Sequence, residues 1–214
     1  MIKAVLLDFD GTLVYRDILD VICGIVGKAK ESYKINNDFL TGKLPGLTAL
    51  ITRINFLQGL SLFQIEKQLD QDTYLTTGAK ELIDFLNQQK IIIILYSGNI
   101  TPILSYYQKL LGINYIVGSQ PKMEGQKIIG ISKEDFPGKE FKLLGVKKIL
   151  HKLSILKEET LAIGDSSADK SMFKFAGKSV AINPKNGIEK FTDFVIDNNL
   201  SKTIPIIKKL NKIY

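Results

Sequence analysis

The residues best suited to chemistry in this sequence are polar residues that end or closely follow apolar runs. They are Asp8 and Asp10, Ser97, and Asp165 with Asp169. Carboxylates that converge on one point repel one another unless a cation lies among them. A few hard oxygen ligands, with room left for water and phosphate, suit Mg²⁺. The pattern therefore predicts a magnesium site that handles phosphate.

Paired carboxylates beside such a metal have a specific use. One carboxylate attacks phosphorus and forms an acyl phosphate. A second, two residues away, protonates the leaving alkoxide and then deprotonates the hydrolytic water. Backbone N–H groups near Gly11 and Gly98 are suited to holding phosphate oxygens. Each polar residue also has a plainer interpretation, because helix caps and turns use the same residue types: a cap for Asp8, a turn or cap for Ser97, and a loop with a cap for the later aspartates.

These residues meet only if the fold brings several strand ends together. After Gly78, apolar runs alternate with helical patterns, which predicts an α/β fold with a doubly wound parallel sheet. Ligands of such sheets gather at the carboxyl ends of the strands. The predicted strands cover 2–7, 91–96, 115–117, 160–163, 179–182 and 194–196. The predicted helices cover 79–89, 102–111, 141–153, 170–176 and the C-terminal stretch, and a hairpin is predicted over 122–131.

Residues 17–73 differ from the rest, because their apolar residues recur only at helical spacing, with Ser61 beginning one of the helices. We therefore predict an inserted helical cap domain, residues 14–76. The core domain is predicted to consist of residues 1–13 and 77–214. The charges of the insertion sum to zero, so the core carries the whole formal net charge of +7.

Three motifs carry a resemblance to a known family. They are DFDGT at 8–12, SGN at 97–99 and GDSSAD at 164–169, in this order and each at a predicted strand end. With them the sequence resembles the haloacid dehalogenase superfamily. The helical insertion, GKL at 42–44, Arg53, and a hairpin followed by a lysine-bearing helix resemble its phosphoserine phosphatase branch. The resemblance extends over nearly the whole chain, although only the motifs are specific.

The resemblance implies roles for the four aspartates. Asp8 would be the nucleophile and Asp10 the general acid and base. Mg²⁺ would be held by Asp8, by the backbone carbonyl of Asp10 and by Asp165. Asp169 would be a further metal ligand or would contact the ligands without binding the metal itself.

The phosphoryl oxygens, by the same resemblance, would be held by Ser97, Gly98 and a lysine. Lys142 stands at the family's spacing before the GD pair, so it is the residue we choose. Lys139 and Lys147 are alternatives, because this stretch is rich in lysine and most lysines are solvated.

Substrate recognition is expected from the insertion. Arg53 would grip a substrate carboxylate, and Asp17 would face an ammonium group; ordinary surface charge is the alternative for both. Four positions depart from the family's pattern and affect the choice of substrate more than the chemistry. They are Asn99 in place of a glycine, Ala168 in place of an asparagine, Asp17 in place of a glutamate, and Gly46 in place of an aromatic residue.

Composition excludes several other chemistries. The chain has one cysteine, Cys23, and one histidine, His151, so an intrachain disulfide, a structural zinc cluster and a multi-histidine site are excluded. A Ser-His-Asp triad would depend on His151 alone, which we interpret as a surface residue. The most apolar stretch, 91–96, is too short to cross a membrane. The basic residues are spread along the chain, which argues against a nucleic-acid partner.

We therefore expect a cytoplasmic, Mg²⁺-dependent phosphomonoester hydrolase that acts through an aspartyl-phosphate and is most similar to phosphoserine phosphatase. Its expected partner is a small phosphorylated metabolite, and its expected state is a monomer or homodimer. One alternative keeps the chemistry but uses another small phosphomonoester, or transfers the phosphoryl group to an alcohol. A second alternative, of a different class, is a non-catalytic phospho-acceptor or binding module.

Overall fold

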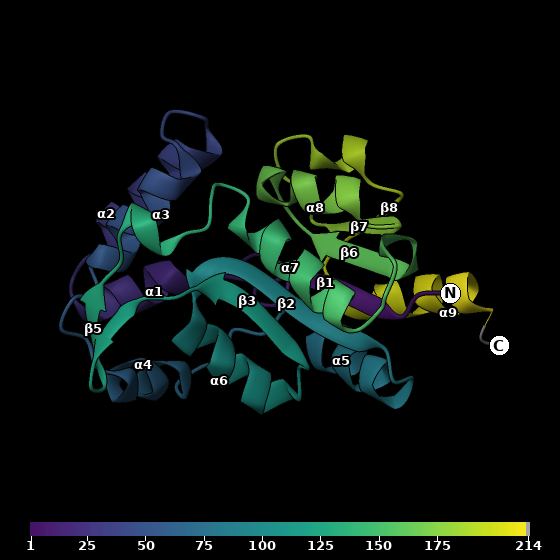
Figure 1. The fold of residues 1–214 in the computed structure, drawn as a ribbon, viewed down its shortest axis with the longest axis horizontal. Coiled ribbons are helices and arrows are strands. Elements are labelled where there is room, and N and C mark those ends of the chain that lie inside the picture. Colours follow the sequence, from purple (N-terminus) through teal and green to yellow (C-terminus); the bar gives the residue numbers. More distant parts are fainter. Residues whose placement is uncertain (213–214) are drawn as a thin grey trace.

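One parallel sheet forms the centre of the protein in a computed structural model that describes residues 1–212 (Figure 1). The strands lie in the order β3-β2-β1-β6-β7-β8, and every pairing between them is parallel. They are β1 (Ala4–Asp8), β2 (Ile92–Ile100), β3 (Tyr115–Ser119), β6 (Thr160–Gly164), β7 (Lys178–Ile182) and β8 (Phe194–Ile196). The predicted α/β fold with a doubly wound parallel sheet is confirmed.

Helices cover both faces of this sheet, as Figure 1 shows. On one face lie α5 (Ala79–Gln88), α6 (Thr101–Leu111) and α9 (Thr203–Asn211), and on the other lie α7 (Phe141–Lys152) and α8 (Lys170–Phe175). In β1, Val5 and Leu7 pack in the cluster of the first group, whereas Ala4 and Leu6 pack in that of the second. A strand buried on both faces must be apolar at every position. This explains the uninterrupted run that predicted β1.

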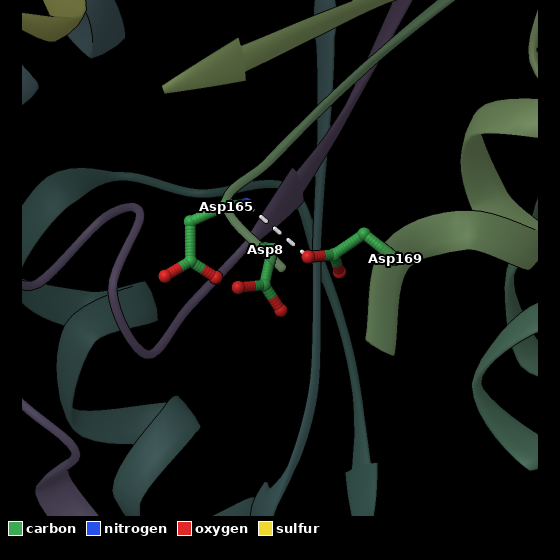
Figure 2. Close-up of side chains that lie close together, drawn as sticks. All are labelled: Asp8, Asp165 and Asp169. Carbon is green, nitrogen blue, oxygen red and sulfur yellow. Dashed lines mark hydrogen bonds between the residues drawn. The ribbon is translucent and has the colours of Figure 1, made fainter. Parts of the chain in front are cut away.

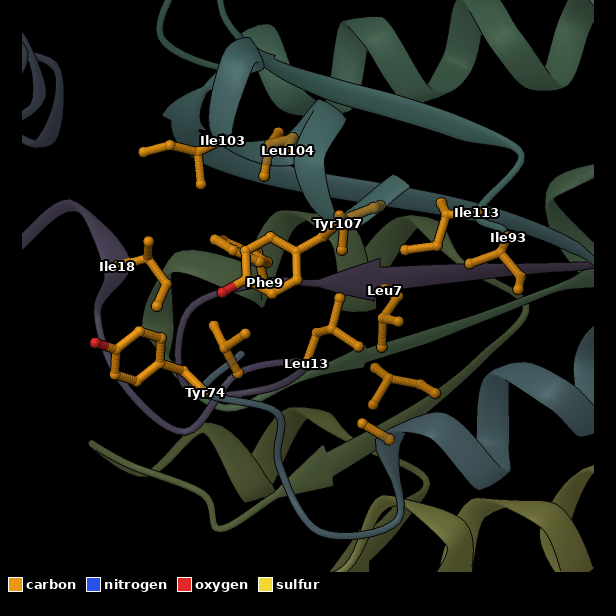
Figure 3. Close-up of a cluster of buried hydrophobic side chains, with 14 of the residues drawn as sticks. Leu7, Phe9, Leu13, Ile18, Tyr74, Ile93, Ile103, Leu104, Tyr107 and Ile113 are labelled. Atoms are coloured by element: carbon orange, nitrogen blue, oxygen red, sulfur yellow. The ribbon is translucent and has the colours of Figure 1, made fainter. Parts of the chain in front are cut away.

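Two buried apolar side chains hold the loop after β1 in place. Phe9 and Leu13 are fully buried among apolar side chains that include Tyr107 (Figure 3). The rings of Phe9 and Tyr107 meet edge to face, with centroids 4.9 Å apart. Because successive side chains of an extended segment alternate in direction, this anchor turns the neighbouring Asp8 and Asp10 away from the cluster.

Strand β2 is longer than its apolar run predicted. It continues from Tyr96 to Ile100, and its register with β3 shifts between these two residues. The run ended at Tyr96 because Ser97 and Asn99 are polar. Irregularities of this kind are frequent beside active sites, where they redirect a side chain, and here the shift falls on the SGN motif.

Four helices form the insertion between β1 and α5. They are α1 (Ile18–Ile25), α2 (Ala29–Leu40), α3 (Gly46–Asn55) and α4 (Leu62–Leu69). The two segments that lead into and out of the insertion lie side by side. Tyr15 N donates to Tyr74 O at 2.9 Å, and Thr76 N donates to Leu13 O at 3.0 Å. The predicted helical texture is confirmed, and the domain division at residues 14 and 76 stays a prediction.

The hairpin predicted over 122–131 is present as β4 (Lys122–Glu124) and β5 (Lys127–Gly130). It lies against the insertion, although the predicted boundaries assign it to the core. Ile128 N donates to Leu60 O at 3.0 Å, and Leu62 N donates to Gln126 O at 2.9 Å. Across residues 1–212, no helix combines the length and the apolar character that crossing a membrane requires.

Candidate active site

Asp8, Asp165 and Asp169 form a buried acidic cluster at the carboxyl ends of β1 and β6 (Figure 2). One carboxylate oxygen from each lies within 4.8 Å of the others. Leu7 pairs with Ile163 in these neighbouring parallel strands, so the residues that follow emerge at one sheet edge. Asp8 is 7% exposed, Asp165 2% and Asp169 0%. These three predicted residues therefore come together.

The cluster carries an excess of negative charge. Burial raises the pKa of Asp8 well above its usual value, and repulsion by Asp169 raises it further, against the opposing charge of Lys142. Burial also raises the pKa of Asp165, and Lys185 opposes that shift. Buried carboxylates are stable as anions only when they are paired or hold a cation. Hard oxygen donors are those that Mg²⁺ prefers, so the residues fit this ion.

Asp10 faces a different environment from Asp8. Its Oδ1 accepts a hydrogen bond from Ile18 N at 2.8 Å, at the start of α1, and its Oδ2 accepts from Ser97 Oγ at 3.2 Å. Burial, and secondarily the charge of Asp17, raise the pKa of Asp10 to about 7. Asp10 is therefore able to give or take a proton near neutral pH.

The SGN motif lies beside Asp10. Ser97 Oγ accepts from Asn99 N at 2.9 Å, and the side-chain amide of Asn99 lies 3.4 Å from both carboxylate oxygens of Asp10. Ser119 Oγ donates to the carbonyl of Gly98 at 2.6 Å and fixes that peptide group. The Asn99 side chain, which departs from the family's pattern, thus contacts the predicted acid and base.

The three candidate lysines are placed differently. Lys142 lies 5.3 Å from the centre of the Tyr96 ring and close enough to Asp8 to lower its pKa. Lys139 lines a pocket that Asp8 and Lys142 also line. The Lys147 ammonium instead lies over the Phe175 ring, 5.2 Å from its centre. Of the three, Lys142 is the one whose charge is among the largest influences on the pKa of Asp8.

Lys185 was missed by sequence reasoning. Its Nζ lies 2.6 Å from Asp165 Oδ2, and its side chain is half exposed. It follows β7, whose carboxyl end reaches the same sheet edge as those of β1 and β6. This position was the available signal, because every strand end at that edge is a candidate.

The insertion brings Asp17 and Arg53 into contact with each other. Arg53 is 5% exposed, and its guanidinium donates to Asp17 Oδ1, to Asp20 Oδ1 at 3.0 Å and to Ser32 Oγ at 2.9 Å. Asp17 also caps α1, accepting from Asp20 N at 2.9 Å. Arg53 is therefore buried rather than a surface charge, and Asp20 is a partner that the sequence analysis did not identify.

A pocket of about 510 Å³ is lined both by aspartates at the strand ends and by Asp17 and Arg53 of the insertion. Its polar end contains Asp8, Asp10 and Asp165, and Arg53 also lines it. Its apolar wall comes from the insertion and consists of Leu19, Phe39, Leu40, Leu47, Ala49 and Leu50.

The missing side chain of Gly46 leaves no hole in this wall. A Cβ at position 46 would lie 2.8 Å from the Phe39 ring. Phe39 therefore occupies the space beside Gly46, and the expected aromatic contribution comes from α2 instead of α3.

Comparisons with known proteins agree with this geometry. Residues 136–205 match the family of haloacid dehalogenase-like hydrolases. The chain is 29% identical over 211 residues to phosphoserine phosphatase of Methanocaldococcus jannaschii, covering 96% of this chain and 98% of that protein. It is 26% identical over 208 residues to phosphoserine phosphatase of Campylobacter jejuni subsp. doylei, covering 97% and 100%.

Solved structures give the same result. The fold superposes with a TM-score of 0.82 and 28% identity on a phospho-aspartyl intermediate analogue of phosphoserine phosphatase, and with 0.85 and 27% on a substrate-bound phosphoserine phosphatase complex. Each alignment covers 96% of this chain and 98% of the other. The chain therefore matches the haloacid dehalogenase superfamily and, along nearly its whole length, resembles the phosphoserine phosphatase-like branch of that superfamily.

Proposed function

We propose that this protein hydrolyses small phosphomonoesters through an aspartyl-phosphate on Asp8, with Mg²⁺ as its cofactor and phosphoserine as its substrate. The observation that carries the proposal is the cluster of Asp8, Asp165 and Asp169, of which Asp8 and Asp165 line a pocket together with Asp10. The similarity to phosphoserine phosphatases along nearly the whole chain supports the same chemistry.

The two aspartates after β1 divide the reaction between them. The Asp8 carboxylate attacks phosphorus, and the bond to the leaving oxygen breaks as Asp10 gives that oxygen its proton. Asp10 then takes a proton from water, whose oxygen attacks phosphorus and releases Asp8. A group with a pKa of about 7 performs both transfers near neutral pH.

The remaining polar residues serve the phosphoryl group and its cofactor. Asp8, Asp165 and the backbone carbonyl of Asp10 would hold Mg²⁺, which neutralises negative charge on the phosphoryl oxygens. Lys142 and Ser97 bind those oxygens, with the backbone N–H of Gly98. Asp169 accepts hydrogen bonds from Asp165 N at 3.2 Å and Ser166 N at 3.1 Å, so we assign it to shaping the loop that presents Asp165.

The charges of the insertion support a substrate with an ammonium group. Asp17, Asp20 and Arg53 carry a net charge of −1 at neutral pH when all are ionised, and they lie in direct contact. An ammonium group would balance that charge, and a carboxylate would need an Arg53 donor for itself. Phosphoserine supplies both groups next to a primary phosphate.

The test compares four phosphate esters with Mg²⁺ present. Phosphoserine carries both groups, phosphoethanolamine only the ammonium, 3-phosphooxypropionate only the carboxylate, and an aryl phosphate neither. We expect the highest kcat/KM with phosphoserine, by roughly 10⁴-fold over an ester that leaves a buried polar group unpaired. Arg53→Ala should reduce the phosphoserine value far more than the aryl value, which also reports whether the variant is folded.

Asp8→Asn is the control for the chemistry and should abolish hydrolysis of all four esters. Equal kcat/KM values for the four esters in the wild type would refute phosphoserine and leave the phosphatase chemistry intact. Activity of Asp8→Asn near the wild-type level would refute the aspartyl-phosphate on Asp8.

A second candidate substrate class is a phosphomonoester with a larger apolar alcohol. The apolar wall that includes Phe39, Leu47 and Leu50 favours it. A higher kcat/KM for the aryl ester than for phosphoserine would select this alternative.

A cytoplasmic location and a monomeric or homodimeric state remain predictions from the sequence. Cell fractionation tests the first, and light scattering of the purified protein tests the second.

A further inference from the structure

Tyr96 contacts both an acidic and a basic residue of the site, Asp169 and Lys142. It is the residue before Ser97 in β2, its side chain is 0% exposed, and its register partner in β1 is Asp8. Tyr96 packs with Leu6 and with Val146 of α7 on the face of the sheet covered by α7 and α8. If packing in this apolar cluster were the only purpose of Tyr96, a buried aliphatic residue would fill the position equally well.

The hydroxyl group of Tyr96 has one partner. It donates a hydrogen bond to Asp169 Oδ1 at 3.0 Å. The other oxygen of Asp169 accepts from the backbone N–H groups of Asp165 and Ser166. The contact thus continues from Tyr96 through Asp169 to the loop that presents Asp165. Loss of the hydroxyl would leave one oxygen of a fully buried carboxylate without this donor, which is costly.

The ring of Tyr96 has a separate partner. The Lys142 ammonium lies 5.3 Å from its centre, within the range of a cation–π contact. Lysine has a long flexible side chain, and holding its ammonium near Asp8 requires contacts that restrict it. The aromatic face provides such a contact without neutralising the charge that a phosphoryl group needs.

We propose that Tyr96 is a positioning residue with two separable actions. Its hydroxyl fixes Asp169 and, through it, the loop of the Asp165 ligand. Its ring fixes the Lys142 ammonium beside Asp8. The second action rests on the function proposed above, whereas the first concerns the acidic cluster alone.

Two kinds of substitution separate these actions. Tyr96→Phe removes the hydroxyl and keeps the ring, while Tyr96→Met and Tyr96→Leu remove both. Two ring-less variants are made so that at least one folded protein is available. Tyr107→Phe is the matched control, because Tyr107 is also 0% exposed and donates its hydroxyl hydrogen bond elsewhere, to Thr73 O at 2.9 Å.

Binding of Mg²⁺ alone, measured by calorimetry without substrate, tests the hydroxyl. Groups that orient metal ligands are worth roughly 10–100-fold in metal affinity, so we expect Tyr96→Phe to weaken Mg²⁺ binding at least tenfold. Tyr107→Phe should keep the wild-type affinity. Equal Mg²⁺ affinities in the wild type and Tyr96→Phe would overturn this action.

Binding of inorganic phosphate to Mg²⁺-saturated protein tests the ring. We expect Tyr96→Phe to keep the wild-type phosphate affinity and to recover its kcat at saturating Mg²⁺. The ring-less variants should bind phosphate more weakly and should not recover. Wild-type phosphate affinity in a folded ring-less variant would overturn this action.

The same measurements distinguish failure of this inference from failure of the proposed function. A wild-type protein that binds Mg²⁺ and hydrolyses phosphomonoesters, with variants that behave identically, refutes only the role of Tyr96. A wild-type protein that hydrolyses none of them refutes the proposed function. The Mg²⁺ affinity of Tyr96→Phe still decides the hydroxyl's action in that case.

Discussion

Single side chains determine how the acidic cluster is neutralised. Lys185 Nζ lies 2.6 Å from Asp165 Oδ2. The charge of Lys142 opposes the rise in the pKa of Asp8 that burial causes. The two lysines differ in their contacts with the proposed Mg²⁺ ligands. Lys142 lines the pocket without an ion pair to Asp165 among residues 1–212, whereas Lys185 contacts an oxygen of Asp165, which is one of the proposed Mg²⁺ ligands. If Mg²⁺ binds as proposed, we expect Lys185 to compete with it for Asp165.

Replacing this competitor gives a test at the residue scale. We expect Lys185→Met to tighten Mg²⁺ binding by roughly tenfold, since a unit charge about 4 Å away is worth on the order of 1 kcal/mol or more. Without Mg²⁺, the same variant should unfold at a lower temperature than the wild type, because Asp165 loses its partner. Calorimetric titration and thermal unfolding in EDTA measure the two effects.

Lys139→Met is the control for a loss of positive charge at the same pocket, because Lys139 lines it without an ion pair to the cluster in residues 1–212. It should change both quantities less. Weaker Mg²⁺ binding by Lys185→Met would show that the lysine orients Asp165 for the metal instead of competing with it.

At the scale of elements, the insertion and the hairpin act together. Helices α1–α4 and the β4–β5 hairpin share backbone hydrogen bonds between residues 59–62 and 126–128. The Asn55 side chain makes two hydrogen bonds with the backbone of Ile131, donating to Ile131 O at 3.1 Å and accepting from Ile131 N at 2.8 Å. The insertion also reaches the catalytic loop directly, since Ile18 N donates to Asp10. A movement of the insertion would therefore carry the hairpin with it and change the surroundings of Asp10.

Closure of the insertion over the phosphate site is the corresponding prediction. Active sites of this kind exclude water by closing a lid. We expect hinges at 14–16 and 75–78, and a second pair beside the hairpin at 119–121 and 131–133. Hydrogen exchange with and without Mg²⁺ and BeF₃⁻ should show increased protection along the pocket wall of α2 and α3. Two structures in these states should show the hairpin moving together with α4.

Unchanged exchange and an unchanged position of the insertion in both states would contradict closure. A hairpin that stays with the sheet while the helices move would contradict the shared movement.

At the scale of the whole molecule, the sheet was predictable because its central strands are buried on both faces and their sequences are therefore continuous apolar runs. The bounds of β8 agree with the prediction, and those of β6 differ by one residue, Gly164. Asp8 and Asp165 were predictable as neighbours because strand ends meet at one edge. In contrast, the contact of the hairpin with the insertion joins segments more than 60 residues apart, and no local pattern specifies it.

The partners of the site residues were harder to predict than the residues themselves. Arg53 was identified, but not its pairing with Asp20, because both lie on helices whose relative rotation is set by packing. In the sequence, Tyr96 is indistinguishable from the other apolar residues of its strand. The hydrogen bond from its hydroxyl to Asp169 depends on the fold, because the two residues are far apart in the sequence. Lys185 was one of many lysines in a basic chain.

The buried carboxylates also affect the stability of the entire protein. Burial raises the folded-state pKa of Asp8, Asp10 and Asp165, with Asp10 at about 7. In the unfolded chain these groups titrate near 3.9. Between these values the folded protein binds more protons than the unfolded chain, so the free energy of unfolding falls as pH rises. Several exposed carboxylates with lowered pKa values act in the opposite direction, but below about pH 5.

We therefore expect the metal-free protein to lose stability between pH 5 and pH 7.5, and Mg²⁺ to restore more stability at pH 7.5 than at pH 5. The physical reason is that ionised carboxylates repel one another until a cation lies among them, and a ligand that binds only the folded state stabilises it. Urea unfolding in EDTA and in Mg²⁺, at several pH values across this window, measures both effects. Asp10→Asn should show a shallower pH dependence because it removes one titrating group, and Asp165→Asn should also lose most of the Mg²⁺ effect. A metal-free protein whose free energy of unfolding rises from pH 5 to pH 7.5 would contradict the electrostatic account of the site.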